Sequence, residues 1–364
     1  MSGAGKGGTR SAAAGNGPAR SLARILARAQ GRRIAVCGDV MLDHFLWGDA
    51  TRISPEAPVP VILLERESDT LGGAANVALN IAALGGRAAI FGFVGDDAAG
   101  ARVRELLRAA GVDTGGLLIA PGRATTVKQR VFARNKHVVR IDREQTLPLD
   151  GAGRRRLLAA FAAAAADGGF AAAVVSDYGK GAVTPELWRG WMAVARRWRL
   201  PVCADPKSNQ MRYAGATMLK PNARELGHLT GLPVEDEAAI ARAAARALRR
   251  HACQSLLVTR GGEGMLLFTA GRMTRISSAA IQVADVTGAG DTVAAALALA
   301  LAVGAPPAAA ARLANAAAAV VVAKPGTAVA TAAEVRAAAG SLSNLTRGGR
   351  RRAGKPPAAA RRRR

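Results

Sequence analysis

The chain has 364 residues, of which 50% are hydrophobic and 21% are charged. That apolar share is enough to build a core, so a wholly disordered protein is excluded. The formal net charge is +25, but four basic residues fall in 1–24 and nine in 341–364, where no acid occurs. Because much of the charge lies at the two ends, it is weak evidence that a folded part binds nucleic acid. We expect disordered extensions at 1–20 and 341–364 around one folded domain at 21–340.

Between the extensions, short apolar runs alternate with helical patterns. Up to residue 142, the predicted elements are a helix at Ser21–Gln30, a strand at Arg33–Gly38, proline-punctuated edge strands in 44–66, a helix at Ala74–Leu84, a strand at Arg87–Val94, a helix at Ala98–Ala110 and two or three strands in 117–142. After residue 170, they are strands at Ala171–Ser176, Pro201–Asp205, Met218–Lys220, Ser255–Arg260 and Met265–Thr269, and helices at Pro185–Arg197, Ala223–Thr230, Glu235–Arg250, Asp291–Val303 and Pro307–Val322. This alternation favours a parallel sheet covered by helices on both faces.

Several site classes are excluded by residue spacing. Cys37, Cys203 and Cys253 lie far apart, so neither a zinc ribbon nor a thioredoxin motif is expected. The four histidines form no close pair that could hold a metal. The longest apolar stretches, 292–303 and 314–323, are shorter than the roughly 20 residues that cross a bilayer. We therefore expect a reduced, cytoplasmic protein without a transmembrane helix.

The motif with the clearest chemistry is Asp285–Thr292 (DVTGAGDT). Its small residues Gly288, Ala289 and Gly290 let a ligand approach the backbone closely. A helix that starts near Asp291 points its free N–H groups at the same loop, which predicts an anion hole for a phosphoryl group. Asp291 itself can be a helix N-cap or a general base beside that phosphoryl group. The chain has no Walker A phosphate loop.

Together with Gly38-Asp39 and Gly72–Asn76 (GGAAN), this motif resembles the ribokinase/PfkB family of carbohydrate kinases over roughly residues 30–335. The resemblance implies an α/β fold, a ribokinase-like three-layer α/β/α sandwich with a mainly parallel central sheet. A small β-sheet lid is expected from about 44–66 and 117–141. The implied ligands are ATP, Mg²⁺ and a sugar, with a monovalent cation near Asp285 and Gly326 and a homodimer joined through the lids.

Further stretches resemble the heptose 7-phosphate kinases of that family. They are Gly38–Asp43 (GDVMLD), Arg52–Val61 (RISPEAPVPV), Ser176–Gly181 (SDYGKG) and Asp205–Lys207 (DPK). The implied reaction is ATP-dependent phosphorylation of D-glycero-β-D-manno-heptose 7-phosphate at its anomeric hydroxyl, in the ADP-heptose branch of lipopolysaccharide synthesis. The chain lacks an HxGH nucleotidyltransferase motif, so a single-activity form is expected. Two alternatives stay open: another sugar or nucleoside kinase of this fold, and an anionic-polymer-binding protein that uses the basic tail.

The resemblance also implies a role for individual residues. Asp291 is the base, and Gly288, Ala289 and Gly290 form the anion hole. The residues it assigns to the sugar phosphate are Asp39, Asp43, Gly72, Gly73, Asn76, Asp205 and Lys207. Because a second phosphate needs cations, the further candidates are Arg134, Lys136, Arg140 and Lys180. In one unbroken strand, Arg134 and Arg140 would share a face.

The resemblance also assigns residues to the binding of ATP. The implied ATP-binding residues are Asn222, Ala223, Arg224, Glu225, Thr259, Gly261, Gly264 and Asn315. Glu225 is also the implied Mg²⁺ ligand, through water. Each assignment has a structural alternative. Asn222 and Glu225 can form a capping box, 259–264 can be a glycine-rich hairpin, and Asn315, expected beside adenine, can face the core or solvent. On the sugar side, Asp43 can be a cap and Gly72-Gly73 a tight turn.

Overall fold

The computed structural model describes residues 18–134, 136–207, 211–279 and 283–339. The predicted tail at 341–364 lies outside these residues, as does nearly all of the predicted N-terminal extension. Helix α1 (Pro18–Ala29) begins three residues before the helix predicted at Ser21–Gln30, inside the expected extension. No helix in the described part of the chain is long and apolar enough to cross a membrane.

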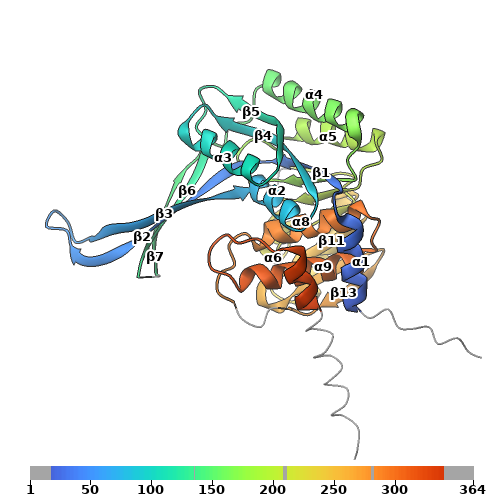
Figure 1. Cartoon of the computed structure of the whole chain (residues 1–364). Coiled ribbons are helices and arrows are strands. Elements are labelled where there is room, and N and C mark those ends of the chain that lie inside the picture. Colours follow the sequence, from blue (N-terminus) through green and yellow to red (C-terminus); the bar gives the residue numbers. More distant parts are fainter. Residues whose placement is uncertain (1–17, 135, 208–210, 280–282, 340–364) are drawn as a thin grey trace, which may run out of the picture.

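A large, mainly parallel sheet forms the centre of the fold (Figure 1). In spatial order, the strands described are β13 (Arg272–Ile276), β12 (Met265–Thr269), β11 (Ser255–Thr259), β10 (Met218–Leu219), β9 (Val202–Asp205), β8 (Ala172–Ser176), β1 (Arg33–Gly38), β4 (Arg87–Gly95) and β5 (Asp113–Ala120). The run from β11 to β5 is parallel, and β12 and β13 pair antiparallel at one edge. The parallel sheet predicted from the alternation is confirmed, although β13 was not anticipated.

Helices pack on both faces of this sheet, so its strands are buried on both sides. In β1, Ile34 and Val36 enter one core cluster, while Ala35 and Cys37 enter the other. The first cluster contains residues of α1, α2 (Ala74–Ala83), α3 (Ala98–Ala109), α8 (Ala289–Ala302) and α9 (Pro307–Val322). The second contains residues of α4 (Gly151–Gly168), α5 (Pro185–Arg197), α6 (Ala223–Thr230) and α7 (Glu237–His251). The three-layer sandwich is therefore as expected.

One helix, α4, was missed from the sequence. Its composition is mostly Ala, Gly and Arg, and its buried residues are only Leu157, Phe161 and Ala165. These are spaced by four and give too short an apolar stripe to be recognised against an alanine-rich background. The helix forms because Asp150 caps it by accepting a hydrogen bond from the Gly153 N–H at 2.6 Å, and because its stripe packs on the large sheet.

A second, four-stranded sheet projects from the body as a long arm (Figure 1). Its strands are, in spatial order, β3 (Pro60–Gly73), β2 (Val40–Ile53), β6 (Thr126–Ala133) and β7 (Lys136–Arg143). The lid predicted from 117–141 was partly wrong, because 117–120 belong to β5 of the large sheet. The pairing of Arg134 with Arg140 on one strand was also wrong. Arg134 has a φ of 47° in the turn that ends β6, so Arg140 lies on the following strand.

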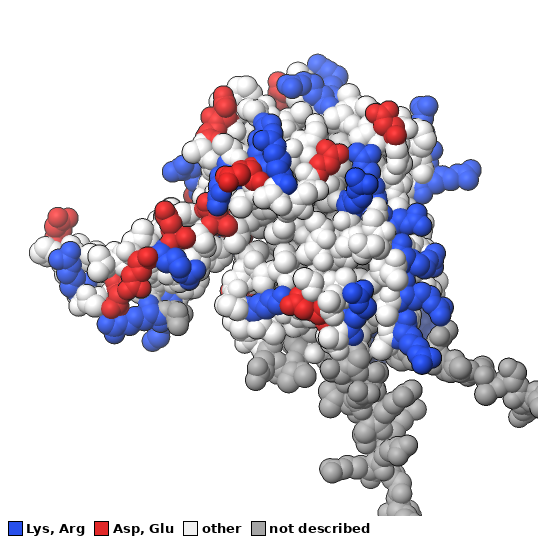
Figure 2. All heavy atoms as spheres, viewed as in Figure 1, with Lys and Arg blue, Asp and Glu red and all other residues white. Residues whose placement is uncertain are grey.

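The charge on the described surface is spread out. Figure 2 shows basic side chains over much of this face, interspersed with acidic ones along the arm. Several basic side chains lie one above another along the right-hand edge of this face. The expectation that the charge is weak evidence for nucleic-acid binding stays a prediction.

Candidate active site

The DVTGAGDT segment forms the first turn of α8. Gly288 is the N-cap with a φ of 78°, in the left-handed region that favours glycine. A Cβ at Gly288 would lie 2.8 Å from Asn76 Nδ2, and one at Gly290 would lie 3.7 Å from Lys220 Nζ. The small residues therefore let two polar side chains approach the helix start. Asp291 lies three residues after the cap, so the alternative in which it is the N-cap is wrong.

Asp291 is held by two side chains from distant parts of the chain. Its Oδ2 accepts a hydrogen bond from Asn76 Nδ2, and its Oδ1 accepts one from the Tyr178 hydroxyl, both at 2.8 Å. The residue is only 3% exposed. Burial raises the Asp291 pKa to about 7, although both hydrogen bonds act to lower it. A carboxylate with that pKa is suited to exchange protons near neutral pH.

Asn76 is part of a buried amide and hydroxyl network. Asn80 donates from Nδ2 to Asn76 Oδ1 at 3.1 Å and to the Asn76 carbonyl at 2.9 Å. Thr292 in turn donates from its hydroxyl to Asn80 Oδ1 at 2.8 Å. These contacts fix which end of the Asn76 amide faces Asp291. The amide is fully buried, and its nitrogen contacts Asp291. The role that the resemblance implied, contact with sugar hydroxyls, stays a prediction.

The Asp39 carboxylate also forms its hydrogen bonds within the protein. Its carboxylate accepts hydrogen bonds from the backbone N–H groups of Tyr178, Lys180 and Ala182 at 2.7, 3.0 and 2.9 Å. Burial raises the Asp39 pKa, and these three bonds act against that rise. Asp39 therefore holds the loop after β8 in place. Both of its oxygens face this loop, and the expected contact with sugar hydroxyls stays a prediction.

Asp43 and Gly72 face each other on paired strands of the arm. A Cβ at Gly72 would lie 2.8 Å from Asp43 Oδ2, so the glycine makes room for the carboxylate. Arg130 Nη1 pairs with Asp43 Oδ1 at 2.6 Å. The neighbouring Gly73 has a φ of 58° and starts α2, and a Cβ there would lie 2.4 Å from the Asp39 carbonyl oxygen. Both glycines thus allow close approaches. Gly72 lies within β3, and Gly73, with its positive φ, makes the turn into α2 that the tight-turn alternative expected.

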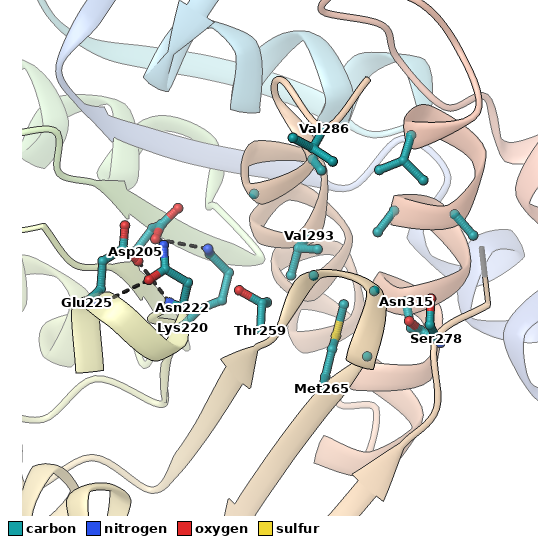
Figure 3. A pocket seen from close by; sticks show the side chains of 18 of the residues that line it. Asp205, Lys220, Asn222, Glu225, Thr259, Met265, Ser278, Val286, Val293 and Asn315 are labelled. Carbon is teal, nitrogen blue, oxygen red and sulfur yellow. Dashed lines mark hydrogen bonds and ion pairs between the residues drawn. The ribbon is translucent and has the colours of Figure 1, made fainter. Parts of the chain in front are cut away.

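A pocket of about 410 Å³ opens beside the start of α8 (Figure 3). The predicted site residues that line it are Asp205, Lys207, Asn222, Glu225, Thr259, Gly261, Gly264, Ala289, Gly290 and Asn315. Gly261 and Gly264 lie in the loop of the β11–β12 hairpin, so the alternative of a glycine-rich hairpin is confirmed, and a 3-10 turn (Gly261–Glu263) forms the loop. Of the described residues, Ala223 and Arg224 are not among those that line the pocket, and Arg224 is exposed. Asp205 and Lys207, which the resemblance assigned to the sugar phosphate, also line this pocket.

Charged side chains alternate along one wall of this pocket. Lys220 Nζ pairs with Asp205 Oδ1 at 3.0 Å, and Lys207 Nζ pairs with Glu225 Oε1. Lys220 is 3% exposed, and burial acts to lower its pKa, but Asp205 and Glu225 outweigh burial and raise it. Burial raises the pKa of Asp205. Sequence reasoning missed Lys220 as a site residue, although a lysine at the end of a buried strand was a signal for it.

Asn222 and Glu225 form the capping box that was one of their two readings. Asn222 Oδ1 accepts from the Glu225 N–H, and Glu225 Oε2 accepts from the Asn222 N–H, each at 2.8 Å. Both still line the pocket. No group of three or more acidic, His or Cys side chains that could hold a metal occurs in the described part of the chain. The donor set suits a magnesium ion that arrives with phosphates and keeps much of its water, rather than a resident ion.

The far end of the pocket is apolar. Its lining there includes Met265, Val283, Val286, Val293, Ala318, Ala319 and Val322 (Figure 3). Asn315 also lines this end, where its Nδ2 donates to the Ser277 carbonyl at 2.8 Å. Small and branched side chains around one fixed amide leave a slot that a flat heteroaromatic group can fill.

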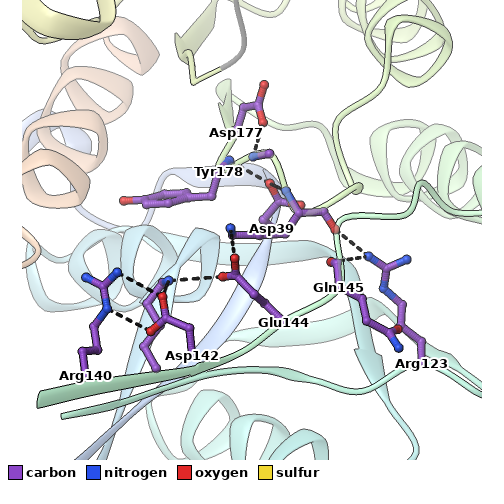
Figure 4. A network of polar contacts seen from close by, with 11 residues as sticks. Asp39, Arg123, Arg140, Asp142, Glu144, Gln145, Asp177 and Tyr178 are labelled. Carbon is purple, nitrogen blue, oxygen red and sulfur yellow. Dashed lines mark hydrogen bonds and ion pairs between the residues drawn. The ribbon is translucent and has the colours of Figure 1, made fainter.

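A cluster of charges lies between the arm and the loop after β8, near Asp39 and Tyr178 (Figure 4). Glu144 pairs with Lys180 at 2.7 Å and with Lys128 at 3.4 Å, and these lysines lower its pKa. Arg140 pairs with Asp142, which also pairs with Lys128. Lys180 and Arg140, two of the four cations predicted for the second phosphate, thus share one network of ion pairs, and their binding of phosphate stays a prediction. Lys128 is an addition to this network, and it lies two residues before Arg130 on β6.

The other two predicted cations lie elsewhere. Arg134 is 70% exposed and pairs with Asp49 at 2.5 Å, at the turn of the β6–β7 hairpin. Lys136 begins β7 and is exposed. Neither belongs to the cluster, because the hairpin turn carries them away from Arg140. The expected monovalent-cation site stays a prediction. Asp285 Oδ2 accepts from the Gly326 N–H at 3.2 Å, which brings those two residues together.

Comparison with known proteins gives consistent results. The profile described as pfkB family carbohydrate kinase matches residues 32–333. The bifunctional protein HldE of Caulobacter vibrioides is 47% identical over 324 residues, which are 88% of this chain and 66% of that protein. The bifunctional protein HldE of Geobacter metallireducens is 43% identical over 78% of this chain and 58% of its own. The chain therefore spans somewhat less than two thirds of these relatives.

Solved structures share the fold at lower identity. Arabidopsis thaliana ribokinase complexed with ribose and ATP aligns with a TM-score of 0.67 and 22% identity, over 86% of this chain and 99% of its own. Escherichia coli phosphofructokinase-2 in complex with substrates and products aligns with a TM-score of 0.71 and 20% identity, over the same shares. At such identities, the likeness shows a ribokinase-like fold.

Proposed function

The chain belongs to the pfkB family of carbohydrate kinases, and we propose that this phosphotransferase moves the terminal phosphoryl group of ATP to the anomeric hydroxyl of D-glycero-β-D-manno-heptose 7-phosphate. The products are ADP and the heptose 1,7-bisphosphate, in the ADP-heptose branch of lipopolysaccharide synthesis. The observation that carries the proposal is the buried Asp291 in the first turn of α8, directly after two residues that line the pocket. The stretches that resemble heptose 7-phosphate kinases support the choice of sugar.

In the proposed mechanism, Asp291 takes the proton from the anomeric hydroxyl. The hydroxyl oxygen then attacks the terminal phosphorus in line, and the bond to the ADP oxygen breaks. The N–H groups of Gly288 and Gly290, together with the positive end of α8, stabilise the charge that spreads over the transferring group. The Ala289 N–H donates to the Val286 carbonyl at 3.2 Å, so the expected anion hole is corrected at that residue. Lys220, next to Gly290, adds a buried positive charge on the same side.

The nucleotide occupies the pocket of about 410 Å³, with adenine in its apolar end near Asn315 and the phosphates toward Lys220. Bound Mg²⁺ supplies charge neutralisation for the phosphates, and Glu225 would hold it through water. Glu225 Oε1 is paired with Lys207, so that lysine would share the same phosphates.

The sugar lies between the arm and the start of α8, near Asp43 and Gly72. Its 7-phosphate is bound by the cation cluster, which we define as Lys128, Arg130, Arg140 and Lys180. Each of these cations is paired with a carboxylate. A phosphate that enters here exchanges one set of charge-assisted bonds for another, which keeps the cost of desolvating the cations low.

We also propose that the arm joins two copies of the chain. Large apolar side chains are exposed on it, namely Ile53, Val59, Leu63, Leu64, Val138, Val139 and Ile141. Exposed apolar residues gathered on a projecting sheet are typical of a protein–protein contact. Pairing through the arm would also cover strand edges that otherwise invite aggregation.

The reaction is tested by a panel of acceptors with detection of ADP. The panel contains the heptose 7-phosphate, the same heptose without phosphate, fructose 6-phosphate, ribose, fructose and adenosine. We expect the highest kcat/KM for the heptose 7-phosphate, with loss of that activity in Asp291→Asn. A higher kcat/KM for an unphosphorylated sugar or a nucleoside would overturn the choice of substrate and favour another kinase of this fold.

A further inference from the structure

The chain contains two tyrosines, and each donates its hydroxyl to a buried carboxylate. Tyr178 donates to Asp291 Oδ1 at 2.8 Å. Tyr213 donates to Asp177 Oδ2, away from the start of α8. The two contacts are chemically alike, but only that of Tyr178 reaches the carboxylate at the head of the pocket. They offer a matched pair in which one phenol touches the proposed base and the other does not.

The backbone around Tyr178 is fixed. Its N–H donates to Asp39 Oδ2 at 2.7 Å, and the N–H groups of Lys180 and Ala182 bind the same carboxylate. Gly38, directly before Asp39, packs so closely on Ser176 that an added Cβ would lie 2.0 Å from the Ser176 carbonyl oxygen. The phenol is therefore delivered to Asp291 by an anchored loop (Figure 4) and not by a freely moving side chain.

Tyr178 also lines the pocket, so the same side chain borders the pocket and contacts the carboxylate. Lys207 Nζ is 5.1 Å from the centre of the ring, and Lys207 pairs with Glu225. The other charges that act on Asp291 are Asp205, which favours its protonated form, and Lys220, which favours its ionised form. Among these groups, the hydroxyl of Tyr178 and the amide of Asn76 are the donors in direct contact with the carboxylate.

We propose that Tyr178 is a positioning residue, whose hydroxyl orients the Asp291 carboxylate and keeps it ionised and ready to accept a proton at neutral pH. The inference rests on the proposed role of Asp291 as the base. A hydrogen bond donated to a carboxylate stabilises the charged form more than the neutral one. Burial already raises the Asp291 pKa to about 7, so loss of one donor would leave the carboxylate largely protonated under neutral conditions.

The first test compares Tyr178→Phe with Tyr213→Phe in the full chain. The measurement is kcat/KM against pH, with the best acceptor found in the panel above. For Tyr178→Phe, we expect the acidic limb of the pH profile, where kcat/KM falls as the base is protonated, to move to higher pH by about one unit or more. This is the scale of one hydrogen bond to a charged group. For a shift of one unit, activity would fall about fivefold at pH 7 and recover toward the wild-type plateau at pH 9. Tyr213→Phe should keep the wild-type limb.

A second measurement avoids deleting the hydroxyl. In a Tyr213→Phe background, Tyr178 is the chain's one remaining tyrosine, so biosynthetic 3-fluorotyrosine changes that position alone. Fluorination makes the phenol a stronger donor, and it should move the acidic limb down, opposite to Tyr178→Phe. Burial and Asp291 raise the pKa of Tyr178 well above 10, which keeps the phenol protonated in the range measured.

Opposite shifts in the two experiments would support the inference. An unchanged limb in both, or a loss of kcat/KM that is equal at all pH values, would overturn it, because a merely structural phenol would not move the limb. Should Asp291→Asn keep its turnover, the proposed base itself is wrong. Should Asp291→Asn lose turnover while the Tyr178 variants leave the limb in place, only the role of Tyr178 is wrong.

Discussion

Asn76 Nδ2 lies 2.8 Å from Asp291 Oδ2, although 215 residues of chain separate the two. Asn80 fixes the Asn76 amide by donating to its oxygen, so the nitrogen is the end that faces the carboxylate. The start of α2 thus braces the start of α8. Four expected outcomes follow from this arrangement and from the arm, and a fifth follows from the glycine that begins α2.

Asp291→Asn should lower kcat by about 10²–10⁴-fold, the usual contribution of a general base. Binding of ATP should change little, because Asp291 is buried behind the described residues that line the pocket. Steady-state kinetics and calorimetric titration with ATP measure the two effects. A kcat within tenfold of wild type in folded protein would remove Asp291 from the base role.

The same substitution should stabilise the protein at alkaline pH. Burial raises the folded-state pKa to about 7, against about 3.9 in the unfolded chain. Between these values, the folded state holds a proton that the unfolded state releases, so the contribution of Asp291 to stability falls as pH rises from about 4 to 7 and is flat above that. We expect Asp291→Asn to gain about 4 kcal/mol over wild type at pH 8 relative to pH 4, where the carboxyl is neutral in the folded state. Urea unfolding at both pH values measures this, and an equal difference at both would contradict it.

Gly73→Ala should destabilise the protein by about 2 kcal/mol or more. The residue has a φ of 58°, and a Cβ would lie 2.4 Å from the Asp39 carbonyl oxygen, which accepts the first N–H of α2. Gly262→Ala is the matched control, because nothing lies within 4 Å of its Cβ position. Thermal unfolding followed by circular dichroism compares the two. Equal melting temperatures for both variants would show that the start of α2 can shift without cost.

Arg140→Ala should raise KM for the phosphorylated heptose about tenfold and leave KM for the unphosphorylated sugar nearly unchanged. The expected loss is that of one charge-assisted contact to phosphate, about 1.4 kcal/mol. Arg134→Ala is the control, since that arginine lies at the hairpin turn and is 70% exposed. If both variants behave alike, the cation cluster is not where the phosphate binds.

Leu63→Asp should turn the proposed dimer into a monomer without loss of folding. Leu63 is 69% exposed on β3 of the arm, so the substitution costs a single chain little. Leu147 is equally exposed, at 70%, but lies off the arm, and Leu147→Asp should leave the assembly intact. Sedimentation velocity measures the mass of both variants. If the wild-type protein sediments as a monomer, the proposed contact between the arms of two chains is wrong.

Most of the large sheet could be predicted because its strands and helices follow local rules. The apolar run at Arg33–Gly38 and the helix that begins with proline at Pro185–Arg197 need no distant partner to be recognised. Helix α4 could not be recognised by the same rules, since its apolar stripe contains only three buried residues in an alanine-rich background. The arm was underestimated because β2 continues almost directly from β1, with Gly38-Asp39 turning the chain out of one sheet and into the other.

From the sequence alone, a glycine-rich helix start with a carboxylate at Asp291 could be predicted, because glycine content, helix start and charge are all local properties. Only the tertiary structure decided which side chains serve that carboxylate. Asp39 turned out to hold a loop, Asn76 to brace Asp291, and Lys220 to stand beside the helix start. Hydrogen-bond partners more than a hundred residues apart are chosen by how the layers pack. The periodicity of the sequence therefore cannot predict which partners meet.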